Sequence, residues 1–325
     1  MPGIDLSQAE LEHYAPAEAA PSDFDEAWAR TLSAARQIPM VPRVTPVENG
    51  LALVRTFDVT FPGFGGDPIR AWLTVPAGAS GRLPVVVGYQ GYGGGRGLPL
   101  EHITWANAGY AELFMDTRGQ GASWGSGGET ADPHGSGPAV PGYLTSGVGS
   151  FETSYYRRLI TDAVRAVDAA RALPQVDPDQ VVVTGVSQGG GLTLAVAGLA
   201  DGLVAAMPDV PFLCNFRRAV EISDSDPYQE VARYLKVHRA RVDEVFATLA
   251  YADGMHHAAR ATAPALFSVA LEDHICPPST VYAAYHAYAG RKHLEVYPFN
   301  DHEGGQSVQV ARQLAWLREL GVTPS

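Results

Sequence analysis

The chain has 325 residues, of which 46% are hydrophobic and 18% are charged, and it contains 35 glycines and 24 prolines. This length and composition suit a globular protein with a sizeable core and many tight turns, and they exclude a disordered or fibrous chain. The net charge of −12 argues against a broad basic surface for nucleic acid or anionic lipid, and two cysteines, Cys214 and Cys276, are too few for a zinc ribbon or a disulfide framework.

The N-terminal segment is acidic and polar, and its first Lys or Arg is Arg30. It therefore has neither the basic nor the apolar region of a secretory signal. The longest apolar stretch, residues 192–200, is about half of the ~20 residues that a membrane span requires. We expect a cytoplasmic protein that binds neither membrane nor nucleic acid.

The first predicted elements are a helix and a hairpin. Ser22, followed by Asp25 and Glu26, predicts a capped amphipathic helix, which prolines between residues 39 and 46 bring to an end. Residues 51–61 and 69–75 are rich in strand formers and flank the sequence PGFGG. They predict a long antiparallel hairpin.

The rest of the chain alternates short apolar runs with helical stretches. The runs are residues 84–88, 111–116, 181–185, 204–208, 265–271 and 294–297. Between the second and third runs, apolar residues at helical spacing from Leu159 to Ala170 predict a helix that ends before Pro174. This alternation is typical of an α/β fold with a mostly parallel central sheet and helices on both faces.

No repeat or biased linker divides the chain, so we expect a single domain over residues 1–325. We expect a helical extension at residues 1–46 and a β-hairpin extension at residues 47–80. Two insertions are expected, a loop-rich one at residues 123–149 and a helical one near residues 217–257.

One strand-turn-helix segment carries a nucleophile motif. Residues 181–191 end a predicted strand and open a helix, and they contain G-x-S-x-G from Gly185 to Gly189. Such a turn presents the hydroxyl of Ser187 at the carboxyl edge of the sheet, and glycine at both flanks lets the neighbouring backbone approach closely. The alternative is an ordinary glycine-rich turn without chemistry.

A serine nucleophile needs a base and an orienting acid. His302 follows the run LEVYPFN and is the last of ten histidines, which fits the hydrolase order of nucleophile, acid and histidine; His274 is its rival. Asp273 follows the run at residues 265–271 and lies between serine and histidine in the chain. The other carboxylates that follow strands or adjoin the histidine are Glu272, Asp209 and Asp301.

The sequence gives little support for a catalytic zinc site or a nucleotide-binding site. His302 and Glu303 open HEGGQ, which lacks the second histidine of a zincin helix, and no dinucleotide-binding or P-loop motif occurs. The glycine-rich residues 91–97 follow a strand, where hydrolases place a loop whose N–H groups face the oxyanion. Cys276, beside Asp273, is expected to be a packed thiol because Ser187 holds the nucleophile position.

Three motifs and several longer stretches resemble one known group of enzymes. The motifs are Arg118-Gly119-Gln120 within MDTRGQGASW, GVSQG at residues 185–189, and His302-Glu303 within NDHEGG. The stretches are GYGGGRG, YYRRLITDAVRAVDAA, DVPFLCNFRRAV and LEDHICPPSTVYAAYHAYAG. They resemble the acetyl xylan esterase and cephalosporin-C deacetylase family, carbohydrate esterase family seven of the α/β-hydrolase superfamily, over nearly the whole chain.

The resemblance implies roles for particular residues. Ser187 is the nucleophile, Asp273 the orienting acid and His302 the general base, in agreement with the interpretation of the motifs. The backbone N–H groups of Tyr92 and Gln188 form the oxyanion hole. The residues that support these motifs are Arg118, Gly119, Gln120, Gly185, Gly189 and Glu303.

The resemblance also implies an activity and an assembly. We expect a serine esterase that removes acetyl groups from small carbohydrates such as acetylated xylo-oligosaccharides and from cephalosporin C, with no cofactor and no metal. Such enzymes form hexamers, and the N-terminal helix and the hairpin are the segments we would place at interfaces. The alternatives are a broader short-chain carboxylesterase or perhydrolase of the same fold, and a non-catalytic binding protein on this scaffold.

Overall fold

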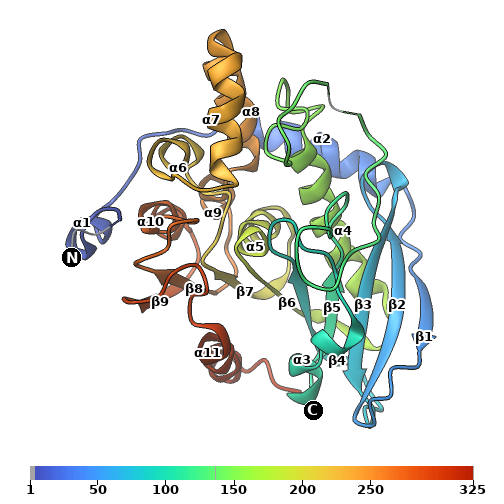
Figure 1. Ribbon diagram of the computed structural model, residues 1–325. Helices are drawn as coiled ribbons and strands as arrows, with labels where there is room; N and C mark the ends of the chain where they lie inside the picture. Colours follow the sequence, from blue (N-terminus) through green and yellow to red (C-terminus); the bar gives the residue numbers. More distant parts are fainter. Residues whose placement is uncertain (1–3, 136, 325) are drawn as a thin grey trace.

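A nine-stranded mixed sheet runs through the computed structural model, which describes residues 4–135 and 137–324 (Figure 1). In spatial order its strands are β1 (Arg43–Val47), β2 (Val54–Pro62), β3 (Pro68–Pro76), β5 (Ala111–Met115), β4 (Leu83–Tyr89), β6 (Val176–Val186), β7 (Leu203–Asp209), β8 (Ala265–Ala270) and β9 (Lys292–Tyr297). Neighbours from β1 to β5 pair antiparallel, and those from β5 to β9 pair parallel. The predicted α/β fold with a mostly parallel sheet is confirmed.

Helices cover both faces of this sheet (Figure 1). The α-helices are α1 (Gln8–Leu11), α2 (Phe24–Arg36), α3 (Thr104–Asn107), α4 (Tyr155–Ala172), α5 (Gln188–Leu199), α6 (Phe216–Ile222), α7 (Tyr228–Val237), α8 (Val242–Leu249), α9 (Gly254–Ala258), α10 (Pro278–Ala287) and α11 (Gln306–Glu319). The short 3-10 helices are η1 (Phe64–Gly66), η2 (Pro99–Glu101), η3 (Arg239–Arg241) and η4 (Ala250–Ala252). None of the described helices combines the length and apolar character needed to span a bilayer.

Each of the six apolar runs forms one of the strands β4 to β9, and the hairpin forms β2 and β3. Strand β1 is not among the predicted elements, because the prolines in this segment indicate a break. Pro46 is tolerated there since β1 lies at the edge of the sheet, where one side of the strand has no ladder to complete.

Residues of the central strands alternate between the two faces. On β4, Val85 and Val87 pack in the largest apolar cluster with residues of α4 and α5. Val86 packs in a second cluster with Trp316 of α11. This alternation follows from the two-residue period of a strand. All seven residues of β4 are buried, which explains why the strand is continuously apolar in the sequence.

The helical insertion between β7 and β8 comprises α6, α7, α8 and α9, and α7 projects from the molecule at the top of Figure 1. Helix α2 reaches this insertion, since the indole Nε1 of Trp28 donates to the carbonyl of Tyr251 at 3.0 Å. The other predicted insertion forms turns and bends, rather than helices or strands, in residues 123–135 and 137–149.

The predicted cap of α2 by Ser22 is wrong. The helix begins at Phe24, and its N-cap is Asp23, whose side chain makes no capping hydrogen bond. The carboxylate of Asp23 instead accepts a hydrogen bond from the hydroxyl of Tyr251. The N-cap carboxylate of α2 is therefore used in a tertiary contact with Tyr251 and does not cap the helix.

Candidate active site

Ser187 occupies the turn between β6 and α5 with φ 59° and ψ −119°, a conformation that non-glycine residues rarely adopt. Its N–H donates to the carbonyl of Asp209 at 3.0 Å, and its carbonyl accepts from Gly191 at 3.0 Å and Phe212 at 2.9 Å. These backbone bonds hold the strained residue in place at the carboxyl edge of the sheet.

Gly185 and Gly189 are required by the close approach of backbone around this turn. A Cβ atom at Gly185 would lie 2.5 Å from the carbonyl carbon of Gly189. A Cβ atom at Gly189 would lie 2.2 Å from the carbonyl oxygen of Tyr89, at the end of the neighbouring strand β4. The atoms in the way are backbone, so no side-chain rotation makes room.

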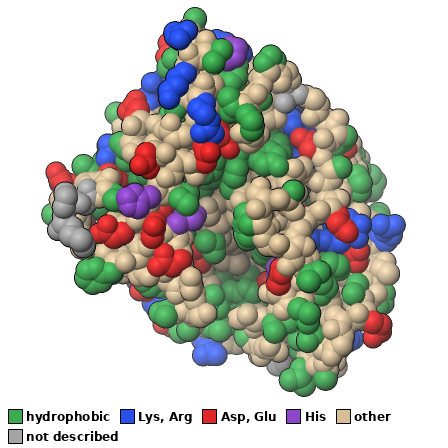
Figure 2. Space-filling model, in the orientation of Figure 1, with side chains coloured by type: hydrophobic (Ala, Val, Ile, Leu, Met, Phe, Trp, Pro, Cys, Tyr) green, Lys and Arg blue, Asp and Glu red, His purple; other side chains and the backbone are tan. Residues whose placement is uncertain are grey.

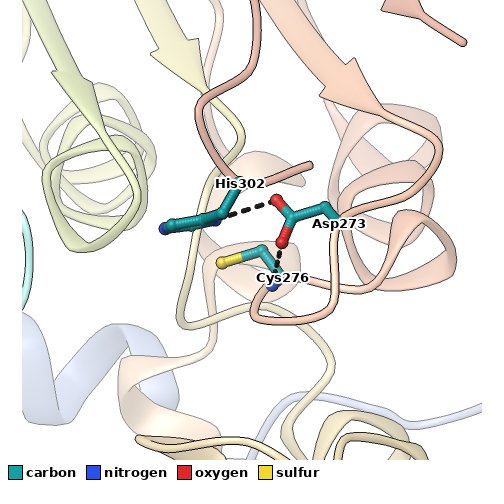
Figure 3. Close-up of side chains that lie close together, drawn as sticks. All are labelled: Asp273, Cys276 and His302. Carbon is teal, nitrogen blue, oxygen red and sulfur yellow. Dashed lines mark hydrogen bonds and ion pairs between the residues drawn. The ribbon is translucent and has the colours of Figure 1, made fainter. Parts of the chain in front are cut away.

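Asp273 and His302 follow the adjacent parallel strands β8 and β9, whose carboxyl ends bring them together (Figure 3). The imidazole Nδ1 of His302 lies 2.9 Å from Oδ2 of Asp273. The other carboxylate oxygen accepts N–H bonds from Ile275 and Cys276, each at 2.8 Å. Asp273 is buried, so its carboxylate is fixed on both sides and assigns the imidazole proton to Nδ1, leaving Nε2 as an acceptor.

Ser187 and His302 line the same cavity of about 350 Å³. Its other lining residues are Gln90, Gly91, Tyr92, Trp124, Val186, Asp226, Pro227 and Ile275. The face shown in Figure 2 is hollowed near its centre, with histidine and acidic side chains beside the hollow. A larger cavity of about 620 Å³ lies elsewhere, beside Trp72 and Arg96, and none of the predicted catalytic residues lines it.

The backbone around Tyr92 leaves one amide available. The N–H of Gly91 donates to Oε1 of Gln90 at 2.8 Å, and the N–H of Gly93 donates to Oε1 of Gln120 at 2.6 Å. The N–H of Tyr92 between them forms no hydrogen bond with the described part of the chain. Gln188 is the first residue of α5, so its N–H has no acceptor within the helix.

Gln120 connects the two loops that carry these amides. Besides accepting from Gly93, its side chain donates Nε2–H to the hydroxyl of Tyr155 and to Oε1 of Gln188, both at 3.0 Å. The same oxygen of Gln188 accepts from the hydroxyl of Tyr156 at 3.0 Å. This buried network fixes the spacing between the loop of residues 91–93 and the start of α5.

Arg118 does not line the cavity and is fully buried. Its guanidinium forms a bidentate ion pair with Asp162, at 2.8 Å for the Nη2 bond, and Nη1 reaches Asp67 at 3.0 Å and Asp132 at 3.1 Å. Its three carboxylate partners come from distant segments, so Arg118 joins the β2–β3 turn, the loop insertion and α4. Gly119, with φ 68°, donates its N–H to Thr130 at 2.8 Å.

Glu303 lies beside His302 but turns to its own loop. Its Oε1 accepts from the side-chain amide of Asn300 at 2.7 Å, and its Oε2 accepts from the N–H of Asp301 at 3.1 Å. Asp301 in turn accepts the N–H of His302 at 2.7 Å. The acidic loop thus fixes the backbone that carries the imidazole.

The rival residues lie outside the relay. Asp209 accepts from Gln309 at 2.9 Å and Gln313 at 2.7 Å, both on α11, and burial raises its pKa to about 7. His274 is exposed, and its N–H donates to Asp301 at 3.2 Å. Glu272 donates its N–H to Asn300 and does not line the cavity.

The structure places Cys276 closer to the site than the sequence indicates. The ligand atoms of Asp273, Cys276 and His302 lie within 4.8 Å of one another. Burial raises the pKa of the thiol, and both oxygens of Asp273 already accept hydrogen bonds. A protonated thiol and an engaged carboxylate suit a proton relay better than a metal centre.

Five other residues of the cavity wall were not predicted as site residues: Gln90, Trp124, Asp226, Pro227 and Ile275. Trp124 is the last residue of MDTRGQGASW, whose motif gives it no role of its own, and Asp226 and Pro227 belong to the helical insertion. Ile275 lies two residues after Asp273 in the chain, and this proximity to the predicted acid is the local signal that could have placed it in the site.

The comparisons with known proteins agree on one family. The model of the family described as acetyl xylan esterase (AXE1) matches residues 1–320. The chain is 28% identical to acetyl esterase Axe7A of Xylanibacter ruminicola over 313 residues, which cover 92% of this chain and 67% of that protein.

Two solved structures are similar over almost their whole length. The acetyl xylan esterase from Paenibacillus sp. R4 has a TM-score of 0.90 and 36% identity, covering 98% of this chain and 100% of its own. Acetyl xylan esterase 1 from Thermoanaerobacterium sp. JW/SL YS485 has a TM-score of 0.89 and 30% identity, covering 98% and 99%.

Proposed function

The chain belongs to the acetyl xylan esterase (AXE1) family and is a carboxylic ester hydrolase, and from this premise we propose that it removes acetyl groups from small acetylated carbohydrates, chiefly xylo-oligosaccharides, and from cephalosporin C. The observation that carries this proposal is that Ser187, on a strained turn, shares a cavity with His302, whose imidazole is held by Asp273.

The proposed reaction begins at the hydroxyl of Ser187. Nε2 of His302 takes the proton of the hydroxyl as the oxygen attacks the ester carbonyl. Asp273 stabilises the resulting imidazolium through the bond to Nδ1. His302 then returns the proton to the departing sugar alkoxide.

The charge that develops on the carbonyl oxygen is met by the N–H groups of Tyr92 and Gln188. Both are held in advance by the Gln120 network, so the donors need no reorganisation during the reaction. Water, activated by His302, attacks the acetyl-enzyme in the second half of the cycle. Acetate leaves and Ser187 regains its proton.

The wall of the cavity supports selectivity for short acyl groups. The bulky side chains of Trp124, Pro227 and Ile275 border a volume of about 350 Å³ that must hold the acyl group and part of the alcohol. A pocket of this kind discriminates by roughly tenfold or more for each excess methylene that does not fit. A broader short-chain carboxylesterase would instead accept butyrate and hexanoate esters as readily as acetate.

The experiment that tests the proposal is measurement of acetate release from acetylated xylo-oligosaccharides, acetylated monosaccharides and cephalosporin C under identical conditions. We expect release from all three, with Ser187→Ala as the inactive control. Release from aryl acetates without release from any of the three would contradict the substrate proposal. A fluorophosphonate probe that fails to label the protein would favour a non-catalytic binding protein on this scaffold.

We further propose that the protein is a homohexamer in the cytoplasm. The family resemblance suggests this assembly, and exposed apolar side chains near the hairpin, Val41 and Leu53, offer surface for contacts between subunits. Both cysteines are free and buried, as suits a reducing compartment. Light scattering coupled to gel filtration gives the mass in solution, and a monomer mass would contradict the hexamer.

A further inference from the structure

A buried carboxylate on the helical insertion binds the side chain of the oxyanion residue. The hydroxyl of Tyr92 donates to Oε1 of Glu230, on α7, at 2.5 Å. The same hydroxyl accepts the N–H of Tyr143 at 2.5 Å, and Oε2 of Glu230 accepts the N–H of Leu144 at 3.0 Å. Glu230 is 3% exposed. Three segments far apart in the chain therefore meet at one carboxylate.

The loop of residues 142–144 encloses this carboxylate without spare room. Gly142 has φ 119°, and a Cβ atom there would lie 2.0 Å from Oε1 of Glu230. Only glycine adopts this conformation and leaves space for the oxygen. The close fit means that the carboxylate position is determined by the loop as well as by α7.

Tyr92 is held at its other end too. Its carbonyl accepts the indole N–H of Trp124 at 2.7 Å, and its neighbours are fixed through Gln90 and Gln120. The other polar group of Tyr92 is its phenol hydroxyl, which is bound by Glu230. The direction of the free Tyr92 N–H therefore depends on a contact made on the far side of the ring.

We infer that Glu230 is a positioning residue for the reaction: through the Tyr92 hydroxyl it fixes the oxyanion donor relative to the acyl cavity. The inference rests on the proposed esterase function. Helix α7 also begins directly after Asp226 and Pro227, which line the cavity. The Glu230 carboxylate thus links the segment that forms part of the cavity wall to the residue that carries the Tyr92 N–H.

A carboxylate is needed here because two donors converge on it. The amide of glutamine offers one acceptor oxygen and one N–H₂ group. In Glu230→Gln the N–H₂ group would therefore face either the Tyr92 hydroxyl or the Leu144 N–H, both of which are donors. The Tyr92 hydroxyl cannot compensate by reversing, since it already accepts from Tyr143 and would be left without an acceptor for its own proton.

The test compares Glu230→Gln, Tyr92→Phe and a matched control, Glu221→Gln, on an aryl acetate. Glu221 is an exposed residue of α6, so the control makes the same chemical change on the same insertion away from Tyr92. A displaced oxyanion donor acts in the transition state and not in substrate binding. We expect kcat to fall by about tenfold or more in Glu230→Gln and Tyr92→Phe, with KM changed by less than about twofold.

A transition-state analogue gives a readout that a general loss of structure would not reproduce. An aryl trifluoromethyl ketone forms a hemiketal oxyanion with the serine, so its inhibition constant should rise by the same factor as kcat/KM falls. The double variant should lose little more than the worse single variant, since both residues act through one bond.

Unchanged kcat in Glu230→Gln, or a rise in KM at constant kcat, would overturn the inference. Additive losses in the double variant would overturn it as well. Near-UV circular dichroism of each variant establishes that the protein assayed is folded. If the wild type and Glu221→Gln themselves fail to hydrolyse acetates, the proposed function fails, and the inference fails with it for that separate reason.

Discussion

The imidazole of His302 and the carboxylate of Asp273 lie 2.9 Å apart, although 29 residues separate them in the chain. Their strands, β8 and β9, are parallel neighbours in register from Ala265 with Lys292 to Ala270 with Tyr297. Residues that follow the two strands by a few positions therefore meet at one edge of the sheet. The helix α10 connects the two strands and begins at Pro278, soon after Asp273.

The first prediction concerns the tautomer of His302. In Asp273→Asn the amide oxygen can keep the bonds to Ile275 and Cys276, so the amide nitrogen faces Nδ1 and moves the imidazole proton to Nε2. The base then has no lone pair for Ser187, and we expect kcat on an aryl acetate to fall by about 10³-fold or more with the fold intact.

The matched control is Asp301→Asn, one residue before the histidine. Within residues 4–135 and 137–324, the Asp301 carboxylate binds the backbone N–H groups of His274 and His302, which an amide oxygen also accepts. We expect its kcat within about tenfold of the wild type. Equal losses in the two variants would show that the whole loop, and not the Asp273 bond, determines activity.

A second prediction addresses the nucleophile. Ser187→Ala should reduce hydrolysis of p-nitrophenyl acetate by at least about a thousandfold and abolish fluorophosphonate labelling. The exposed residue Ser80 provides the control Ser80→Ala, which should retain both properties. Activity of Ser187→Ala close to that of the wild type would leave the cavity without its proposed nucleophile.

A third prediction tests the close packing of the nucleophile turn. Gly189→Ala forces a methyl group against the Tyr89 carbonyl, so strand β4 or helix α5 must move. We expect a loss of about 1–3 kcal/mol or more in the free energy of unfolding, measured by urea denaturation. Gly78→Ala, where a Cβ meets open space, should cost nothing or slightly stabilise. Similar midpoints for the two variants would contradict the packing argument.

A fourth prediction concerns stability and pH. Burial raises the pKa of Glu112, on β5, to about 8 from the ordinary value of 4.5, and its Oε2 has no hydrogen-bond partner among the described residues. The neighbouring His102, whose Nδ1 lies 3.9 Å from Oε1, has its pKa lowered by burial. Between pH 4.5 and about pH 8 the Glu112 carboxyl keeps its proton in the folded state and releases it in the unfolded state. The free energy of unfolding therefore falls as the pH rises through this range.

Glu112→Gln removes this titration. Relative to the variant, the wild type should lose a few kcal/mol of unfolding free energy between pH 5 and pH 8, at about 1.4 kcal/mol for each pH unit. Urea denaturation at both pH values measures the difference, with the exposed Glu221→Gln as control. Parallel stability curves for wild type and Glu112→Gln would show that the carboxyl is ionised in the folded state throughout.

The spacing of residues along the chain was enough to predict much of the fold and of the candidate site. Strand and helix periods are properties of neighbouring residues, so the runs at residues 84–88 and 181–185 predict strands β4 and β6 before any contact is known. The turn at Ser187 is equally local, because strand, glycine and helix follow one another within a dozen residues. Helix capping is less secure, as Asp23 shows, since a single distant hydroxyl can take the capping side chain.

The sequence by itself determined the type of fold, the nucleophile turn and a short set of possible acids, because these depend on residue spacing along the chain. The tertiary structure alone decided that Cys276 lies beside Asp273 and His302, and that Tyr92 is held by Glu230. Tyr92 and Glu230 are 138 residues apart, and such contacts depend on the order of the strands in the sheet and on where the insertions fold back. Neither is encoded in the periodicity of any one segment, because each arises when separate segments bury their faces against a common core.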